Sequence, residues 1–145
     1  AVVSFDPNPN NGGKLHGTEC CVRAWQSFVD KSPAKRILVV AHSAGGAWLC
    51  ACLAKVQHER LNRIKAIALT DTFQNPQTLG VTQLQLLRSR ARHWRTSTEP
   101  LDTPIEDERA GGCECFSAGT TDHASTNFRS KDSIFAFFDL ACAAS

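Results

Sequence analysis

The sequence predicts an α/β fold with an open, mostly parallel sheet and flanking helices. Short apolar runs rich in β-branched residues alternate along the chain with segments of helical periodicity, and turn residues separate them. This alternation is typical of parallel βα units. The chain has 145 residues, of which 42% are hydrophobic, so a single domain spanning residues 1–145 is long enough to bury its own core.

Five apolar segments are the expected strands. They are Ala1–Phe5, Ile37–Ala41, Ile64–Leu69, His93–Ser97 and Cys113–Ala118. The second of these is a continuous apolar run, the pattern of a strand buried on both faces of a sheet. The acidic, Pro- and Gly-containing stretch from Glu99 to Gly112 reads as a surface loop.

Four helices are expected between and after these strands. They run from Thr18 to about Ser32, from the turn after Ala41 to about Glu59, from Leu79 to about Arg92 and from Ser133 to Ala143. Each shows apolar residues at helical spacing. In the last helix we expect Phe135, Phe138 and Cys142 to face the core.

Composition excludes several classes of protein. The 16 Lys and Arg against 14 Asp and Glu give a net charge of +2, which offers no global electrostatic case for nucleic-acid binding. The longest apolar stretch, Gly46–Ala54, is far shorter than the roughly 18 residues of a membrane helix. The seven Cys are odd in number and come mostly in close pairs, which favours a reducing compartment, nuclear or cytoplasmic, over a disulfide framework.

The strongest chemical motif follows the second expected strand. Residues 41–45, Ala-His-Ser-Ala-Gly, fit the nucleophile-elbow pattern, in which small residues two before and two after the serine permit a sharp strand-to-helix turn. Ser43 is then the candidate nucleophile, and the Ala44 N–H is the candidate oxyanion donor at the helix N-terminus. The simpler alternative is that Ser43 only caps the helix.

A serine nucleophile needs a general base later in the chain, and His123 fits this role best. It follows the Cys113–Ala118 run by a short turn, at the carboxyl end where open α/β sheets place their sites. The other four histidines are weaker candidates, and we expect His42, next to Ser43, to point elsewhere. A capping or loop histidine is the alternative for His123.

Two aspartates compete to orient the imidazole. Asp102 gives the chain order Ser, Asp, His that is expected of α/β-hydrolases and is the preferred candidate. Asp71, at the end of the Ile64–Leu69 strand, is the alternative acid, although it could simply cap the following turn.

Five segments, taken together, resemble a known family. They are Ile37–Gly46, Ile64–Thr72, Ser97–Thr103, Ser117–His123 and Ser133–Phe138. As an ordered set they resemble the argonaute-binding "Arb-two" domain family, and within it the cotranscriptional regulator group. The resemblance implies an α/β-hydrolase-like fold with an elbow serine at Ser43 and a histidine at His123.

The resemblance leaves two functions open. One is a serine hydrolase of the carboxylesterase type, acting on a small ester or acyl substrate without a cofactor. The alternative is a catalytically weak or inactive interaction domain of a nuclear cotranscriptional or RNA-silencing regulator, which binds protein or RNA partners, including splicing machinery. Fluorophosphonate labelling of Ser43 separates the two.

The sequence departs from the family pattern in two places. Ala44 stands where the family often carries an aromatic residue, which opens the pocket wall beside Ser43. The chain opens with Ala1 instead of Met, and Ala1–Phe5 resembles the fourth strand of the family's sheet. We therefore expect a fragment or processed form that lacks the N-terminal strands, including the one that supplies the second oxyanion donor.

Two further clusters have simpler interpretations. Arg88, Arg92 and Arg95 are predicted to share one face near a helix end, either solvated or facing the phosphates of RNA or an acidic partner. Cys113 and Cys115 share one face of a strand with no histidine partner expected nearby. Buried free thiols are therefore expected there, and no metal site.

Overall fold

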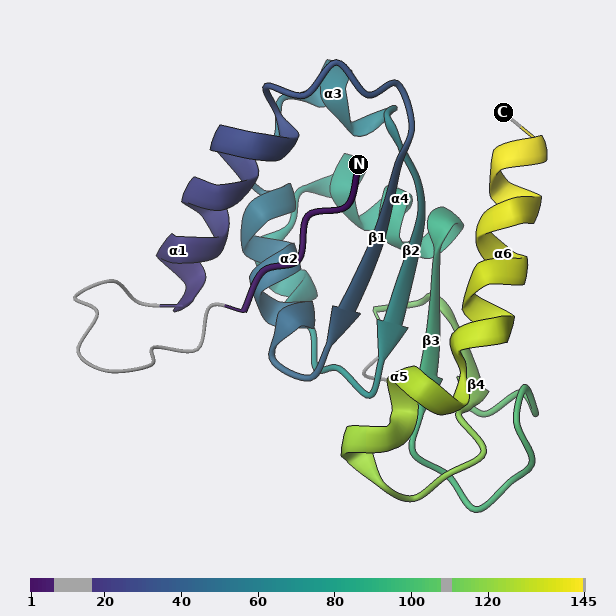
Figure 1. Cartoon of the computed structure of the whole chain (residues 1–145). Helices are drawn as coiled ribbons and strands as arrows, with labels where there is room; N and C mark the ends of the chain where they lie inside the picture. Colours follow the sequence, from purple (N-terminus) through teal and green to yellow (C-terminus); the bar gives the residue numbers. More distant parts are fainter. Residues whose placement is uncertain (7–16, 108–110, 145) are drawn as a thin grey trace.

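A four-stranded, all-parallel sheet organises the chain (Figure 1). The structure, a computed structural model, describes residues 1–6, 17–107 and 111–144. The strands are β1 (Ile37–His42), β2 (Ile64–Thr70), β3 (Ala91–Arg95) and β4 (Glu114–Ser117), and they lie in the order β1-β2-β3-β4. The predicted α/β class with an open parallel sheet and flanking helices is confirmed.

Helices lie on both faces of this sheet (Figure 1). The helices are α1 (Gly17–Ala24), continued by the π-helical turn η1 (Trp25–Val29), α2 (Gly45–Leu53), α3 (His58–Leu61), α4 (Val81–Arg90), α5 (Thr126–Arg129) and α6 (Lys131–Ala143), with the 3-10 turns η2 (Pro76–Thr78) and η4 (His123–Ser125). Within the described ranges, no helix combines the length and apolarity needed to cross a membrane.

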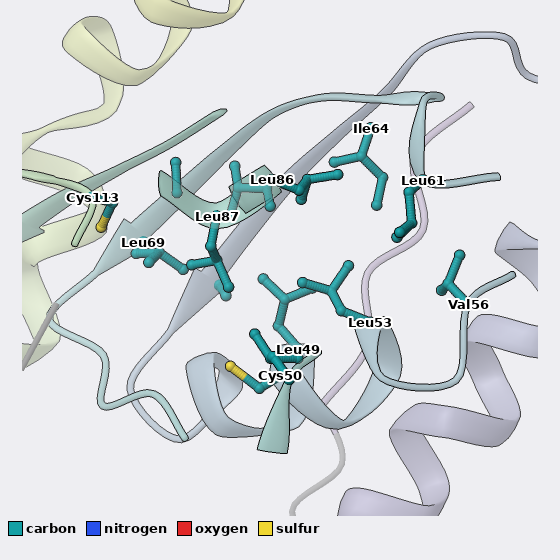
Figure 2. Packing of buried hydrophobic residues seen from close by; sticks show 14 of the residues in the cluster. Leu49, Cys50, Leu53, Val56, Leu61, Ile64, Leu69, Leu86, Leu87 and Cys113 are labelled. Atoms are coloured by element: carbon teal, nitrogen blue, oxygen red, sulfur yellow. The ribbon is translucent and has the colours of Figure 1, made fainter. Parts of the chain in front are cut away.

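The central strand β2 supplies side chains to two cores. On one face, Ile67 and Leu69 pack with residues of α2 and α4 such as Leu53 and Leu87, as Figure 2 shows for part of this cluster. On the other face, the small Ala66 and Ala68 belong to the cluster that contains Ile134 and Phe138 of α6. Because β2 is covered on both faces, it carries the almost continuous apolar run that the sequence shows.

Strand β1, in contrast, lies at the edge of the sheet, so the prediction that it is buried on both faces is wrong. Its side chains alternate, and Leu38 and Val40 are 41% and 54% exposed. They lie on the α6 side, but α6 packs over the neighbouring strands. A run of apolar residues shows that the side chains of a strand are apolar, but it does not show whether a helix covers them in the fold.

The exposed flank of α6 turns toward the same region. Phe137 packs against Trp94 of β3, with ring centroids 6.1 Å apart. Phe135 lies two helical residues away, about 200° around the axis, and therefore on the flank toward β2 and β1. It is 65% exposed, which corrects the prediction that it faces the core. We call Leu38, Val40 and Phe135 the uncovered strip.

Other boundaries also differ from the predictions, among them the end of α2, which lies at Leu53 and not near Glu59. Ala1–Phe5 forms no strand, and Val2 is 95% exposed. The predicted helix to Arg92 ends at Arg90, because Ala91 onward pairs with β2 and Trp94 is buried in the sheet. Strand pairing with a segment far away in the sequence overrides local helical periodicity there.

Gly46 permits α2 to approach the loop after β2. A Cβ atom at Gly46 would lie 2.7 Å from Thr72 Cβ and 2.8 Å from the Phe73 carbonyl oxygen. We expect Gly46→Ala to lower the free energy of unfolding by about 1–3 kcal/mol, because the helix must shift to accept the methyl group.

Urea denaturation measures this effect, and Gly45→Ala is the matched control. A Cβ at Gly45 meets only Ala41 Cβ at 3.6 Å, an ordinary contact, and alanine favours the helix. Equal losses of stability in the two variants would contradict the close approach of α2 to Thr72.

Candidate active site

Ser43 lies at a sharp turn between β1 and α2. Its φ is 53°, in the left-handed region that a residue with a Cβ rarely adopts. Ala44 is the N-cap residue of α2, so its N–H lies at the positive end of the helix dipole. This backbone geometry is the one that a nucleophile elbow requires.

His123 pairs with Asp71 at the carboxyl edge of the sheet. The distance from His123 Nδ1 to Asp71 Oδ2 is 2.6 Å. Asp71 follows β2 directly, and its Oδ1 accepts hydrogen bonds from the Thr96 N–H at 3.2 Å and the Thr96 hydroxyl at 3.1 Å. Because an ionised carboxylate only accepts, we assign the proton to Nδ1, which leaves His123 Nε2 as an acceptor.

Hydrogen bonding keeps Asp71 ionised. Burial by itself raises the pKa of this carboxyl, but the hydrogen bonds from His123 and Thr96 outweigh burial and hold the pKa below its ordinary value. Arg95 Nε adds a positive charge 3.7 Å from Asp71 Oδ1. The carboxylate is thus fixed in position and charge.

This depressed pKa predicts a pH-dependent stability difference between wild type and Asp71→Asn. A carboxyl whose pKa is lowered by folding stabilises the native state at and above its ordinary pKa, and that contribution is lost as the pH falls through the lowered value. We expect wild type to be the more stable at pH 7 and the difference to shrink below about pH 4. Thermal unfolding across pH measures it, and two parallel curves would contradict it.

Asp102, the preferred acid from sequence, lies elsewhere. Its Oδ1 accepts from Trp94 Nε1 at 2.8 Å, and its Oδ2 accepts from the Ser133 hydroxyl at 2.6 Å. Asp102 therefore ties β3 to the start of α6, and the carboxylate behind His123 is that of Asp71. Chain order favoured Asp102, whereas the order of β2, β3 and β4 in the sheet brings Asp71, after β2, to His123, after β4.

His42 does not point away from the site as expected. Its ring centroid lies 4.7 Å from that of His123, with 32° between the ring planes. Its Nδ1 lies 2.9 Å from the Thr70 carbonyl oxygen, which can only accept, so Nδ1 carries the proton. Strand alternation could have revealed this, because His42 shares its side of β1 with Leu38 and Val40.

The serine and the histidine are neighbours without a hydrogen bond. His42 contacts His123 and precedes Ser43, so His123 lies beside the elbow. Among the described residues, however, the Ser43 hydroxyl has no hydrogen-bond partner. The contact between His123 and Asp71 that a triad would need is present, and the contact between Ser43 and His123 is not. Such bonds are often long before a substrate binds.

The predicted arginine face does not exist. Arg92 and Arg95 lie on β3 and not on the helix with Arg88. Arg92 Nε pairs with Glu114 at 3.1 Å, and its guanidinium lies 4.7 Å from the centre of the Phe137 ring. Arg95 pairs with aspartates, and Arg88 donates to a backbone carbonyl. These side chains are bonded within the fold.

The cysteine pair at the start of β4, Cys113 just before the strand and Cys115 within it, has a histidine beside it, contrary to expectation. His93 of β3 lies opposite Cys115 in the strand register. With Asp107 these residues form a group whose ligand atoms all lie within 4.8 Å of one another. Sequence spacing missed His93 because only strand pairing brings it to Cys115. None of the seven cysteines, all of which lie in the described ranges, forms a disulfide.

Comparison with known proteins gives the family. A family model described as the Arb2 domain matches residues 16–101, more than half of the chain. The chain belongs to the Arb2 domain family. This confirms the resemblance found in the sequence, and it places the elbow, β2 and β3 of this Arb2 domain inside the matched region.

Several curated relatives carry the name of a cotranscriptional regulator. The Arb2 domain is 37% identical over 125 residues to the "Cotranscriptional regulator ARB2A homolog" of Xenopus tropicalis, 85% of this chain and 29% of that protein. It is 34% identical over 125 residues to the human "Cotranscriptional regulator ARB2A", 85% of this chain and 30% of the relative. It is 30% identical over 128 residues to the "Cotranscriptional regulator ARB2A homolog" of Dictyostelium discoideum, and the match covers 86% of this chain and 33% of that relative. The chain thus spans about a third or less of these relatives, and no solved structure matches it.

Proposed function

We propose that this Arb2 domain is an interaction domain of a nuclear cotranscriptional regulator. The names of its relatives support this class of function. The observation that carries the proposal is the uncovered strip: Leu38 and Val40 of β1 and Phe135 of α6 remain exposed, whereas the buried side of α6 packs on β2 and β3. Exposed apolar surface of this kind marks a site for a protein partner.

A protein partner is favoured over RNA. Phosphate recognition needs available arginine and lysine side chains, and the arginines near β3 are bonded within the fold. The uncovered strip instead offers leucine, valine and phenylalanine. We infer that the partner is a protein of the transcription, RNA-silencing or splicing machinery that contributes an apolar segment.

Quantitative co-purification from nuclei tests this proposal. The double variant Leu38→Ser, Val40→Thr is compared with Val81→Thr, a matched change at a valine that is 84% exposed on α4. We expect wild type, Val81→Thr and Ser43→Ala to retain the same RNA-processing proteins and the double variant to lose most of them. If the double variant keeps the full set, or wild type retains nothing beyond a tag-only control, the proposal fails.

A serine-hydrolase activity is the second candidate, and the His123–Asp71 pair favours it. With Nδ1 committed to Asp71, His123 Nε2 can take a proton from Ser43, while the Ala44 N–H and the dipole of α2 stabilise an oxyanion. The substrate would be a small ester or acyl compound, and these groups need no cofactor.

Fluorophosphonate labelling tests the second candidate directly. We expect a reagent adduct on Ser43 of wild type and none on Ser43→Ala, as located by peptide mass spectrometry. Equal labelling of both proteins, or none of folded wild type, would exclude the hydrolase reading and leave the interaction domain.

A further inference from the structure

We propose that His42 is a positioning residue, which holds the His123 imidazole in the orientation that proton transfer from Ser43 requires. The inference rests on the hydrolase candidate and deepens it, because it adds a residue to that site. The centroids of the two imidazole rings lie 4.7 Å apart, with 32° between the ring planes. This separation is within the range of stacked aromatic rings, so His42 lies against the His123 ring.

The His123 ring needs a second restraint besides its bond to Asp71. Its side chain is half-exposed and lies in the short turn η4, so burial alone does not fix the ring. The pairing of Nδ1 with Asp71 Oδ2 at 2.6 Å fixes one ring atom. The χ2 torsion of a histidine has broad minima, so the ring can still turn about this bond and carry Nε2 away from the elbow. The adjacent ring of His42 restricts that rotation.

His42 is itself fixed through Thr70 on the neighbouring strand. The two residues lie opposite each other in the register of β1 and β2, and Thr70 is fully buried. The Thr70 carbonyl accepts from His42 Nδ1 at 2.9 Å and from the Ser43 N–H at 3.2 Å. One buried carbonyl therefore sets the direction of the His42 ring and the position of the candidate nucleophile together.

A second link joins Thr70 to the segment that carries His123. The Thr70 hydroxyl donates to Asn127 Oδ1. Asn127 belongs to α5, which begins just after η4 and lies at the carboxyl end of the sheet (Figure 1). The hydroxyl of Thr126, a fully buried residue, donates to the His123 carbonyl at 2.9 Å. The elbow strand and the His123 segment, far apart in the sequence, are thus connected at the ring of His42 and at Asn127.

The role that we infer needs a flat ring at position 42 and no charge. When His123 takes the Ser43 proton it becomes a cation, and a second positive charge 4.7 Å away would oppose that step. His42→Phe keeps a neutral ring that can stack in the same place, whereas His42→Ala leaves the His123 ring free to turn. The two substitutions therefore have opposite expected effects.

Proton NMR of the whole chain, labelled with ¹⁵N-histidine, tests the orientation of His123 directly. A proton held between Nδ1 and a carboxylate at 2.6 Å resonates far downfield and is sharp only while the ring is held in place. We expect this resonance in wild type and in His42→Phe, and its loss or broadening in His42→Ala. Its absence from His123→Asn assigns it. His58→Ala, the same change at an exposed histidine of α3, is the matched control and should keep the resonance.

Labelling kinetics measure the consequence for Ser43. The rate of fluorophosphonate labelling at several reagent concentrations separates the affinity for the reagent, KI, from the maximal rate, kinact. A misdirected base slows the reaction and not the binding, so we expect His42→Ala to lower kinact by about 10- to 100-fold and to change KI by less than about twofold. His42→Phe should restore kinact to within about threefold of wild type. Circular dichroism shows which variants fold, and His42→Leu, which fills the space without a flat ring, replaces His42→Ala if that variant does not.

The outcomes separate this inference from the hydrolase candidate. If His42→Ala keeps both the sharp resonance and the kinact of wild type, if His42→Phe loses as much as His42→Ala, or if folded wild type lacks the resonance, the role of His42 is wrong. The hydrolase candidate then depends on the labelling of Ser43 alone. If Ser43 of wild type is not labelled but the resonance responds to His42→Ala, the hydrolase candidate fails and the orientation of His123 by His42 stands.

Discussion

Replacing Trp94 with alanine is expected to lower the free energy of unfolding by about 3–5 kcal/mol, the largest stability effect of any single change considered for this domain. Trp94 is only 2% exposed, and its ring lies 6.1 Å from those of Phe116 and Phe137. Truncation leaves a cavity between β3 and α6. It also removes the Nε1–H that Asp102 accepts at 2.8 Å, so a carboxylate loses one of its two side-chain donors.

Equilibrium unfolding in urea measures this loss of stability. The variant Trp94→Phe separates the contribution of the hydrogen bond to Asp102 from that of the aromatic ring in the core. Phenylalanine keeps an aromatic ring in the core but cannot donate to Asp102, and we expect a loss of about 1.5–3 kcal/mol from the hydrogen bond. Val81→Ala, at a side chain that is 84% exposed, is the control and should change stability by less than about 0.5 kcal/mol. A Trp94→Ala loss similar to that of the control would contradict the packing of α6 on β3.

The second large effect concerns the two aspartates and rests on the hydrolase candidate. We expect Asp71→Asn to slow fluorophosphonate labelling of Ser43 by about 10⁴-fold. The asparagine amide can donate to His123 Nδ1, which favours the tautomer with the proton on Nε2. That nitrogen then cannot accept the proton of the Ser43 hydroxyl, although the site keeps its shape.

Asp102→Asn is the matched control because it makes the same chemical change at the other aspartate. Its amide oxygen can still accept from Trp94 Nε1, and its amide nitrogen can donate to the Ser133 hydroxyl. We expect the folded variant to label within a few-fold of wild type. If Asp102→Asn slows labelling as strongly as Asp71→Asn, the assignment of Asp71 as the orienting carboxylate is wrong.

Local sequence patterns predicted the helices and strands well where residues near one another in the sequence determine the structure. The strand predicted at Ile64–Leu69, which is β2, and the Ala-His-Ser-Ala-Gly turn into α2 were both placed correctly. Sequence periodicity gave wrong predictions where contact with a distant segment of the chain determines the structure. The segment from Ala91 is a strand because β2 lies beside it, and Phe135 is exposed because only one side of an aromatic-rich helix can face the sheet.

The candidate site likewise has a part that local sequence predicted and a part that depends on the tertiary structure. The sharp turn at Ser43 and Ala44 was predicted from sequence because the steric needs of such a turn appear as small residues at fixed spacing. The partner of His123 depends on distances between the ends of β2 and β4, which are far apart along the chain. The order Ser, Asp, His along the chain is a regularity of α/β-hydrolases and carries no information on distances. It therefore favoured Asp102, whereas the sheet brings Asp71 to the imidazole of His123.

By itself, the sequence determined the α/β class, the parallel strands, the elbow and membership of the Arb2 domain family, because periodicity and short motifs record local sterics and solvent exposure. Only the tertiary structure decided that Asp71 pairs with His123, that His42 contacts the same ring, that β1 is an uncovered edge and that His93 meets Cys115. The three contacts each join residues from different strands or loops, and the exposure of β1 depends on where α6 packs. The packing of the whole chain sets the order of strands in a sheet, and no single segment determines it.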